Sequence, residues 1–187
     1  MPVRRRRRVL VCQAGLVSDA GWEQRVAEAW ASFDQCSGPE FVALIDRLAA
    51  ELPQASPRGA FERACAFDST GQPDRAVPLY RQALAQGLHA AHRRRAVIQL
   101  ASSLRNLGQP HDSVELLTAE LAAGSDPLDD AVRAFLALAL ADTGREREAV
   151  SLALAALAPH LPRYQRSLAN YARHLTAPHH PSDEPTE

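Results

Sequence analysis

The sequence of 187 residues contains no lysine and few aromatic residues, with two Trp, three Tyr and five Phe. All 21 basic residues are therefore arginine, a bias typical of a high-GC bacterial genome, because arginine, alanine, glycine and proline have GC-rich codons. Val and Ile nowhere alternate with polar residues over a long stretch, so a sheet is hard to place. Much of the hydrophobic fraction of 46% is alanine, the best helix former, and we expect an all-α protein.

The three cysteines, Cys12, Cys36 and Cys65, are widely spaced, and no Cys-x-x-Cys pair or other zinc-ligand spacing occurs. An odd number of isolated cysteines favours reduced thiols, so we expect a cytoplasmic protein without a metal site or cofactor. No apolar run approaches the roughly 20 residues that a membrane-spanning helix requires, and no membrane partner is expected. The formal charge of −1 also makes nucleic acid an unfavoured partner over the whole surface.

The two ends of the chain carry opposite charges. Arg4–Arg8 precede an apolar stretch that is too short for a signal peptide and is interrupted at Gln13. We expect residues 1–20 to be either a disordered basic arm or the result of a misassigned start. Residues 176–187 carry three carboxylates and predict a disordered acidic tail, which either remains free or occupies the protein's own groove.

Residues that could carry chemistry are isolated from one another. His89 and His92 are three apart at a predicted helix start, a spacing that two metal ligands can have, but no third ligand lies beside them. Ser102 and Ser103 lack a Gly-x-Ser-x-Gly context, and no glycine-rich phosphate loop occurs. We therefore expect a protein that is not an enzyme.

The strongest pattern is an internal repeat. Gly71, Gly108 and Gly144 are spaced 37 and 36 residues apart, each between two apolar-periodic segments. Glycine suits the left-handed residue that ends a helix, and the Pro that follows the first two suits the next helix's first turn. Small residues lie seven before and five after each glycine: Ala64, Ala101, Ala137, Ala76, Ser113 and Ala149. Large residues lie four before and thirteen after: Phe67, Leu104, Leu140, Leu84, Leu121 and Leu157. Small residues facing each other across a turn let two antiparallel helices approach closely.

Over residues 58–158 this pattern resembles the tetratricopeptide repeat family, whose unit is a helical pair of about 34 residues. The first unit fits best, with Ala64, Phe67, Gly71, Ala76, Tyr80, Ala83 and Leu84 at the expected offsets. The second unit departs at Glu120 and the third at Ala153. Phe61–Leu121 also resembles a small bacterial family of such repeats without a defined biochemical role.

The resemblance implies a right-handed α-solenoid, and apolar stripes at its two ends bring the expected number of helices to nine. Apolar stripes predict a degenerate N-terminal hairpin over residues 21–52, and another stripe predicts a capping helix over residues 159–175. Between them lie the three repeats of residues 58–158. Terminal elements of solenoids are atypical because they cover the ends of the stack.

In such solenoids the first helix of each pair lines a concave groove. The residues that we expect to bind a partner there are Arg58, Phe61, Asp68, Arg95, Ile98, Ser102, Arg105 and Asn106. Cys65 and Ser69 lie in the same row, and the groove turns apolar toward Leu138. Relatives that bind chaperone tails clamp a terminal carboxylate with Lys and Asn, but Phe61 and Cys65 stand at those places here. Of the consecutive Arg93, Arg94 and Arg95, only Arg95 is expected to face the groove, with the others in solvent.

The function that this implies is a non-catalytic scaffold binding a protein or peptide segment in the concave groove. Two alternatives stay open: a nucleic-acid-associated protein that uses the arginine arm, and a homo-oligomeric structural module. Repeats of this kind serve many unrelated partners, so the resemblance alone identifies neither a partner nor a pathway.

Overall fold

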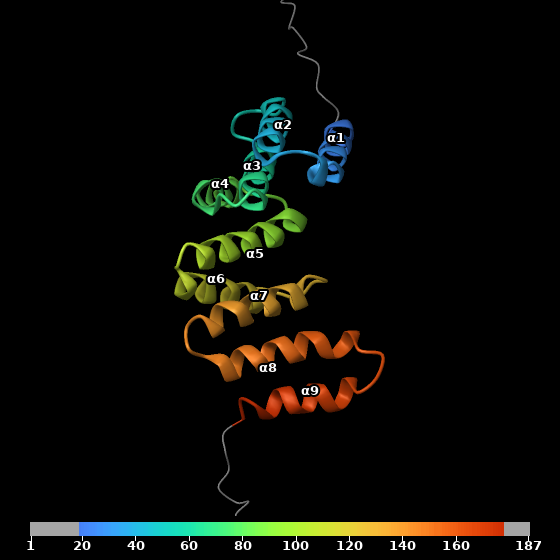
Figure 1. Cartoon of the computed structure of the whole chain (residues 1–187), viewed down its shortest axis with the longest axis vertical. Helices are drawn as coiled ribbons and strands as arrows, with labels where there is room; N and C mark the ends of the chain where they lie inside the picture. The colour runs from blue at the N-terminus through green and yellow to red at the C-terminus, as the bar shows by residue number, and fades with distance from the viewer. Residues whose placement is uncertain (1–18, 178–187) are drawn as a thin grey trace, which may run out of the picture.

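The computed structural model describes residues 19–177, which form nine α-helices and no β-strand (Figure 1). The arm expected at 1–20 and the tail expected at 176–187 lie outside these residues except for two positions each. The helices are α1 (Asp19–Ala31), α2 (Gly38–Ala50), α3 (Pro57–Ser69), α4 (Pro73–Ala85), α5 (Ala90–Asn106), α6 (Pro110–Ala122), α7 (Asp129–Ala141), α8 (Glu146–Leu157) and α9 (Gln165–His174). Two short 3-10 helices, η1 (Phe33–Gln35) and η2 (Ala158–His160), precede α2 and α9.

The helices stack in chain order along the long axis of the molecule, from α1 and α2 at one end to α9 at the other (Figure 1). Each helix packs against the next, so α3 to α8 form three antiparallel hairpins. The first helix of the middle hairpin, α5, also packs against α3 and α7, the first helices of its neighbours. These first helices therefore form one layer of the stack, and the second helices form another.

The turn inside each of the three hairpins is built on a glycine. Gly71, Gly108 and Gly144 have φ angles of 75°, 76° and 76°, in the left-handed region that favours glycine. In the first two hairpins the next helix begins at a proline, Pro73 or Pro110, whose fixed φ suits the first helical position. The repeat of about 36 residues is thus a repeat of hairpin geometry. The N-terminal hairpin differs, because α2 begins with a capping box between Ser37 and Glu40.

The small residues of the repeat are buried where the two helices of a hairpin meet. Ala64, Ala101 and Ala76 are each 0% exposed, and the large residues four before the glycines are buried beside them. The last large position is an exception in the third repeat. Leu157, which the pattern placed inside, is 47% exposed at the end of α8. Leu157 is the last residue of α8, and the chain continues directly into η2.

Three apolar clusters follow one another along the stack. The first surrounds Phe41 and Ile45, the second Phe61 and Tyr80, and the third Leu117 and Val132. Residues between the clusters connect them, because Trp30 and Val42 touch the first two and Leu116 touches the last two. The core is therefore continuous, as expected for stacked hairpins that cannot bury their own faces alone. Among residues 19–177 no helix is long and apolar enough to span a membrane.

Candidate binding groove

A hollow of about 410 Å³ opens between α1, α3 and α5, the first helices of the first three hairpins. We call the layer of first helices the inner layer and the layer of second helices the outer layer. Its lining combines indole rings, arginines, a carboxylate and small polar groups. The residues are Trp22, Glu23, Val26, Ala27 and Trp30 of α1, Arg58, Glu62, Cys65 and Ser69 of α3, and His92, Arg95 and Gln99 of α5. Side chains from three different hairpins therefore converge on one site.

Arg58 is held in place by α1. Its guanidinium lies 2.6 Å from Glu23 Oε1 in an ion pair and 4.8 Å from the centroid of the Trp22 ring. The Trp22 indole is itself fixed, because Nε1 donates a hydrogen bond of 2.8 Å to the backbone oxygen of Leu48 in α2. A cation over an aromatic face is attracted by the ring quadrupole. Arg58 thus forms a wall of the hollow that is held by contacts with α1.

Glu62 places a buried carboxylate at the floor of the hollow. Its Oε2 accepts a hydrogen bond of 2.8 Å from Trp30 Nε1, which links α3 to α1. Burial raises the pKa of Glu62, since the charged form loses its hydration, while the hydrogen bond from Trp30 and the charges of Arg95 and Arg58 act in the opposite direction. Ionising the buried carboxylate therefore costs free energy, and the positive charges of the two arginines offset part of that cost.

Arg95 is the exposed cation of the hollow. Its guanidinium lies 5.4 Å from the centroid of the Phe61 ring, and no carboxylate of the described residues lies within 4.0 Å of it. His92 meets the same ring edge-on at a centroid distance of 5.5 Å. Burial lowers the pKa of His92, and the positive charges of Arg95 and Arg58 lower it further. Arg95 therefore supplies the positive charge on the α5 side of the hollow. The lowered pKa makes His92 less readily protonated, so His92 adds little to this charge.

Cys65 in the same hollow is not a nucleophile at neutral pH. It is 5% exposed, and burial raises the pKa of its thiol to about 12. A thiolate is the reactive form of cysteine, and a reactive thiol needs a lowered pKa. In the described part of the chain no group of three or more His, Cys, Asp or Glu side chains could hold a metal ion. His89 and His92 therefore gain no third ligand there.

A family model described as tetratrico peptide repeat matches residues 57–175. The match runs from the start of α3 to the end of α9 and covers well over half of the sequence. The chain belongs to the tetratricopeptide repeat family. Tetratricopeptide scaffolds generally mediate protein–protein interaction and are generally non-catalytic. The hairpin of α1 and α2 lies before the matched residues, although it supplies five residues of the hollow.

Solved structures of tetratricopeptide-like repeats share the fold. The repeats of a kinesin light chain-like protein from Podosopora anserina are 24% identical with a TM-score of 0.63, and 82% of each chain is covered. The MamA RS-1 ArsTM double mutant is 17% identical with a TM-score of 0.57, covering 82% of this chain and 93% of that one. Comparison with curated proteins gave no match. Together with the family match, these likenesses establish the right-handed α-solenoid predicted from the sequence.

The structure separates the residues expected in the tetratricopeptide groove into three groups. Arg58 and Arg95 come together in the hollow. Phe61 and Ile98 are 1% and 6% exposed, so both lie in the core beneath the groove and not on its surface. The helical phase explains this correction, because consecutive residues of a helix point about 100° apart. Glu62 and Gln99, one residue further along each helix, occupy the hollow instead.

The remaining expected residues lie further along α3 and α5, outside the hollow. Asp68 is half-buried between two hydroxyl groups of neighbouring elements, and burial raises its pKa. Arg105 forms an ion pair of 2.6 Å with Asp142 of the third repeat. Ser102 is half-buried and Asn106 exposed beside it. These polar residues border the inner layer but do not line the hollow.

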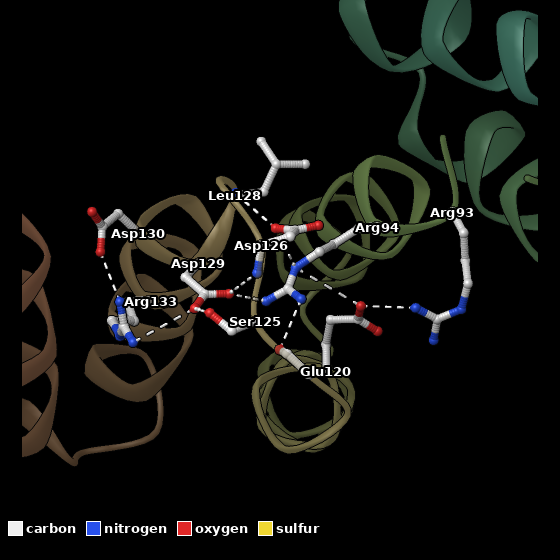
Figure 2. A network of polar contacts seen from close by, with 10 residues as sticks. Arg93, Arg94, Glu120, Ser125, Asp126, Leu128, Asp129, Asp130 and Arg133 are labelled. Carbon is white, nitrogen blue, oxygen red and sulfur yellow. Dashed lines mark hydrogen bonds and ion pairs between the residues drawn. The ribbon is translucent and has the colours of Figure 1, made fainter. Parts of the chain in front are cut away.

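Arg94 is a second correction, because it is buried at 6% exposure and does not point to solvent. Figure 2 shows its guanidinium between α6 and the loop that leads into α7. It donates to the backbone oxygen of Gly124 at 3.0 Å and to Asp129 Oδ1 at 2.5 Å. It also lies 3.3 Å from Asp126 and 3.9 Å from Glu120, which Arg93 contacts at 2.8 Å from the other side. The network joins the second repeat to the third and does not form part of the groove.

Proposed function

We propose that the chain is a non-catalytic scaffold that binds an extended segment of a protein partner along its inner layer, with the hollow between α1, α3 and α5 as the anchor. The observation that carries this proposal is the position of Arg95. Its exposed side chain lines the hollow of about 410 Å³ and forms no ion pair within 4.0 Å among the described residues, although it acts on the charge of Glu62 over a longer distance. Tetratricopeptide scaffolds generally mediate protein–protein interaction, so a segment of a protein is the ligand class that we propose.

The chemistry of the hollow favours a segment that carries an acidic side chain next to an apolar one. A carboxylate can pair with Arg95, because planar guanidinium donors match carboxylate oxygens. The half-buried Trp30 ring with Ala27 supplies the apolar contact beside it. Gln99 and Ser69 supply donors and acceptors for the peptide backbone. The negative Glu62 at the floor selects against two adjacent acidic groups entering together.

Nucleic acid is the less favoured partner. The arginine run of residues 4–8 lies outside the described residues, and without it the remaining sequence up to residue 177 carries a small acidic excess. A binding mode that uses phosphate contacts needs a basic stripe on one face.

A cytoplasmic location stays a prediction from the isolated cysteines.

The proposal is tested with an array of extended ten-residue peptides in which acidic and apolar positions are varied. We expect the protein to select peptides with one Asp or Glu beside a bulky apolar residue. Arg95→Ala is expected to weaken binding by roughly 10- to 100-fold, the range for a lost hydrogen bond to a charged group. The matched control is Arg81→Ala, an exposed arginine on the outer helix α4. Equal binding by wild type and Arg95→Ala would contradict the proposal.

A further inference from the structure

Two carboxylates line the hollow between α1, α3 and α5, and only that of Glu62 is buried. Glu23 is exposed and paired with Arg58, whereas Glu62 is 9% exposed and forms no ion pair among the described residues. The hydrogen bond from Trp30 Nε1 goes to Oε2 of Glu62. The other oxygen, Oε1, accepts no hydrogen bond from the described residues and is not fully buried. Glu62 therefore offers one unused oxygen to a ligand that enters the hollow.

Arg95 and Glu62 reach the hollow from α5 and α3, which are neighbouring helices of the inner layer. Their charged groups lie more than 4.0 Å apart, because no ion pair joins them, but the charge of Arg95 still acts on Glu62. A ligand carboxylate that pairs with Arg95 therefore also experiences the charge of Glu62. An ionised Glu62 repels that carboxylate, whereas a protonated Glu62 can donate a hydrogen bond to it.

We propose that Glu62 couples the capture of an acidic segment to the uptake of one proton, with its protonated carboxyl donating from Oε1 to the carboxylate that Arg95 holds. This inference rests on the proposed function, because it concerns the same segment in the same hollow. With Glu62 ionised, the two arginines of the lining face two carboxylates and their charges cancel. With Glu62 protonated, one positive charge remains for the acidic segment, which then binds more tightly.

The burial of Glu62 makes the protonated form easier to reach. Burial raises the pKa of this carboxyl, because the charged form loses its hydration. A bound ligand carboxylate adds a second negative charge nearby and raises the pKa of Glu62 further. A group whose pKa rises on binding takes up protons, and the affinity then increases as pH falls.

The other titratable groups that line the hollow lie on α1, α3 and α5. Glu23 of α1 is already paired with Arg58, and the Cys65 thiol of α3 is neutral because burial raises its pKa to about 12. The helices α2 and α4 also pack on α3, but they contribute no side chain to the hollow. His92 of α5 is the alternative proton acceptor in this lining, although burial and the nearby arginines lower its pKa.

The first test measures the affinity of the full-length chain for a ten-residue peptide with one Asp beside one Leu, from about pH 8 to about pH 5. The peptide Asp stays ionised over this range, because its ordinary pKa is about 3.9. We expect the affinity to rise about 10-fold as pH falls, as for one hydrogen bond to a charged group. The same peptide with Asn in place of Asp is the control and is expected to show no such rise.

Glu62→Gln imitates the protonated carboxyl at every pH. Its amide oxygen can keep the hydrogen bond from Trp30 Nε1, and its amide nitrogen then donates from the position of Oε1. We therefore expect Glu62→Gln to bind the Asp peptide at neutral pH about 10-fold more tightly than wild type, without further gain on acidification. His92→Gln removes the alternative proton acceptor and is expected to keep the rise in affinity.

The second test observes the proton on Glu62 through the indole of Trp30. The sequence contains two Trp, so the spectrum of indole Nε1–H groups holds two signals, and Trp30→Phe identifies the one from Trp30. In the free chain this signal is expected to change with pH around a midpoint above the ordinary glutamate value of about 4.3. The midpoint is expected to move to higher pH when the Asp peptide is bound. Glu62→Gln is expected to lose this transition.

The outcomes separate this inference from the proposed function. If neither this peptide nor any peptide of the array binds at any pH, the proposed function is wrong, and this inference with it. Binding that requires Arg95 but does not change with pH contradicts only this inference. A rise in affinity that survives in Glu62→Gln and is lost in His92→Gln assigns the proton to His92 and overturns the proposal. A Trp30 midpoint that stays unchanged on peptide binding overturns it as well.

Discussion

The hydroxyl of Ser103 donates a hydrogen bond of 2.9 Å to Asp68 Oδ1, across the boundary between the first and second repeats. Ser103 is 0% exposed, and the other oxygen of the same carboxylate lies 3.4 Å from the Tyr80 hydroxyl. Thirty-five residues separate the two partners in the sequence. The next boundary is bridged in a comparable way by Arg105 and Asp142. Polar contacts therefore fix how successive hairpins sit on each other, in addition to the apolar core.

Ser103→Ala tests the first of these contacts. Removing the hydroxyl leaves the half-buried Asp68 carboxylate with one donor fewer, and a hydrogen bond to a charged group contributes about 1.5–3 kcal/mol. We expect the free energy of unfolding, measured in urea, to fall within that range. The control is Ser102→Ala, since the hydroxyl of the half-buried Ser102 makes no hydrogen bond among the described residues. A loss in Ser103→Ala no larger than in the control would show that the contact does not stabilise the boundary.

Ala101→Leu tests the close approach of the helices in the second repeat. Ala101 is 0% exposed, so a larger side chain there overpacks the crossing of α5 with its neighbours and is expected to cost about 1–3 kcal/mol. Ser102 is half-buried, so Ser102→Leu is expected to leave the free energy of unfolding nearly unchanged. The measurement is the midpoint of urea unfolding for both variants. If Ser102→Leu were the costly change, the assignment of the buried face of α5 would be wrong by one residue.

The sequence predicted the hairpins well because their signal is local. A glycine with left-handed φ, small residues at fixed offsets and a following proline all act within one repeat, and the structure shows each in place around Gly71 and Gly108. The solenoid follows from stacking such units. The end of the third repeat was less predictable, since the exposure of Leu157 depends on where η2 takes the chain afterwards.

The candidate site was only partly predictable because it depends on contacts between distant segments. Arg58 and Arg95 were expected in the groove, and the structure places both in the hollow. Trp30 and Glu62 were not, since their pairing joins residues 32 positions apart on helices of different hairpins. The burial of Arg94 is likewise decided by Gly124 and Asp129, 30 and 35 positions away. Helical periodicity gives the phase of one helix and contains no information on such partners.

Arg94→Leu tests the network between the second and third repeats. The substitution leaves the buried Glu120 and the partly buried Asp129 without their shared cation, and breaking a buried ion pair on one side typically costs about 3–5 kcal/mol. The control is Arg63→Ala, which pairs with Asp46 at 3.0 Å near the surface, away from this network, and is expected to cost about 0–1 kcal/mol. Thermal and urea unfolding of both variants provide the comparison. Equal stability of the two variants would show that the network around Arg94 stabilises the fold no more than an exposed ion pair does.

Glu62→Gln tests the buried carboxylate at the floor of the hollow through its pH dependence. Burial raises the pKa of Glu62 in the folded protein, whereas the unfolded chain has an ordinary glutamate pKa of about 4.3. The folded state therefore binds the proton more tightly than the unfolded state. Its contribution to stability is fully present below the ordinary value and is lost as pH rises through the raised value, because the ionised group must then remain buried.

Glutamine cannot ionise, but its amide oxygen can still accept the hydrogen bond from Trp30 Nε1. The free energy of unfolding of Glu62→Gln relative to wild type is thus expected to increase with pH from about 4 upward and to level off above the folded pKa. Asp68 also has a raised pKa, but it is present in both proteins and cancels in the difference. Urea unfolding of both proteins at a series of pH values measures this quantity. A difference that stays constant, or that decreases as pH rises, would show that Glu62 is not more easily protonated in the folded state, because only a raised folded pKa gives wild type the steeper loss.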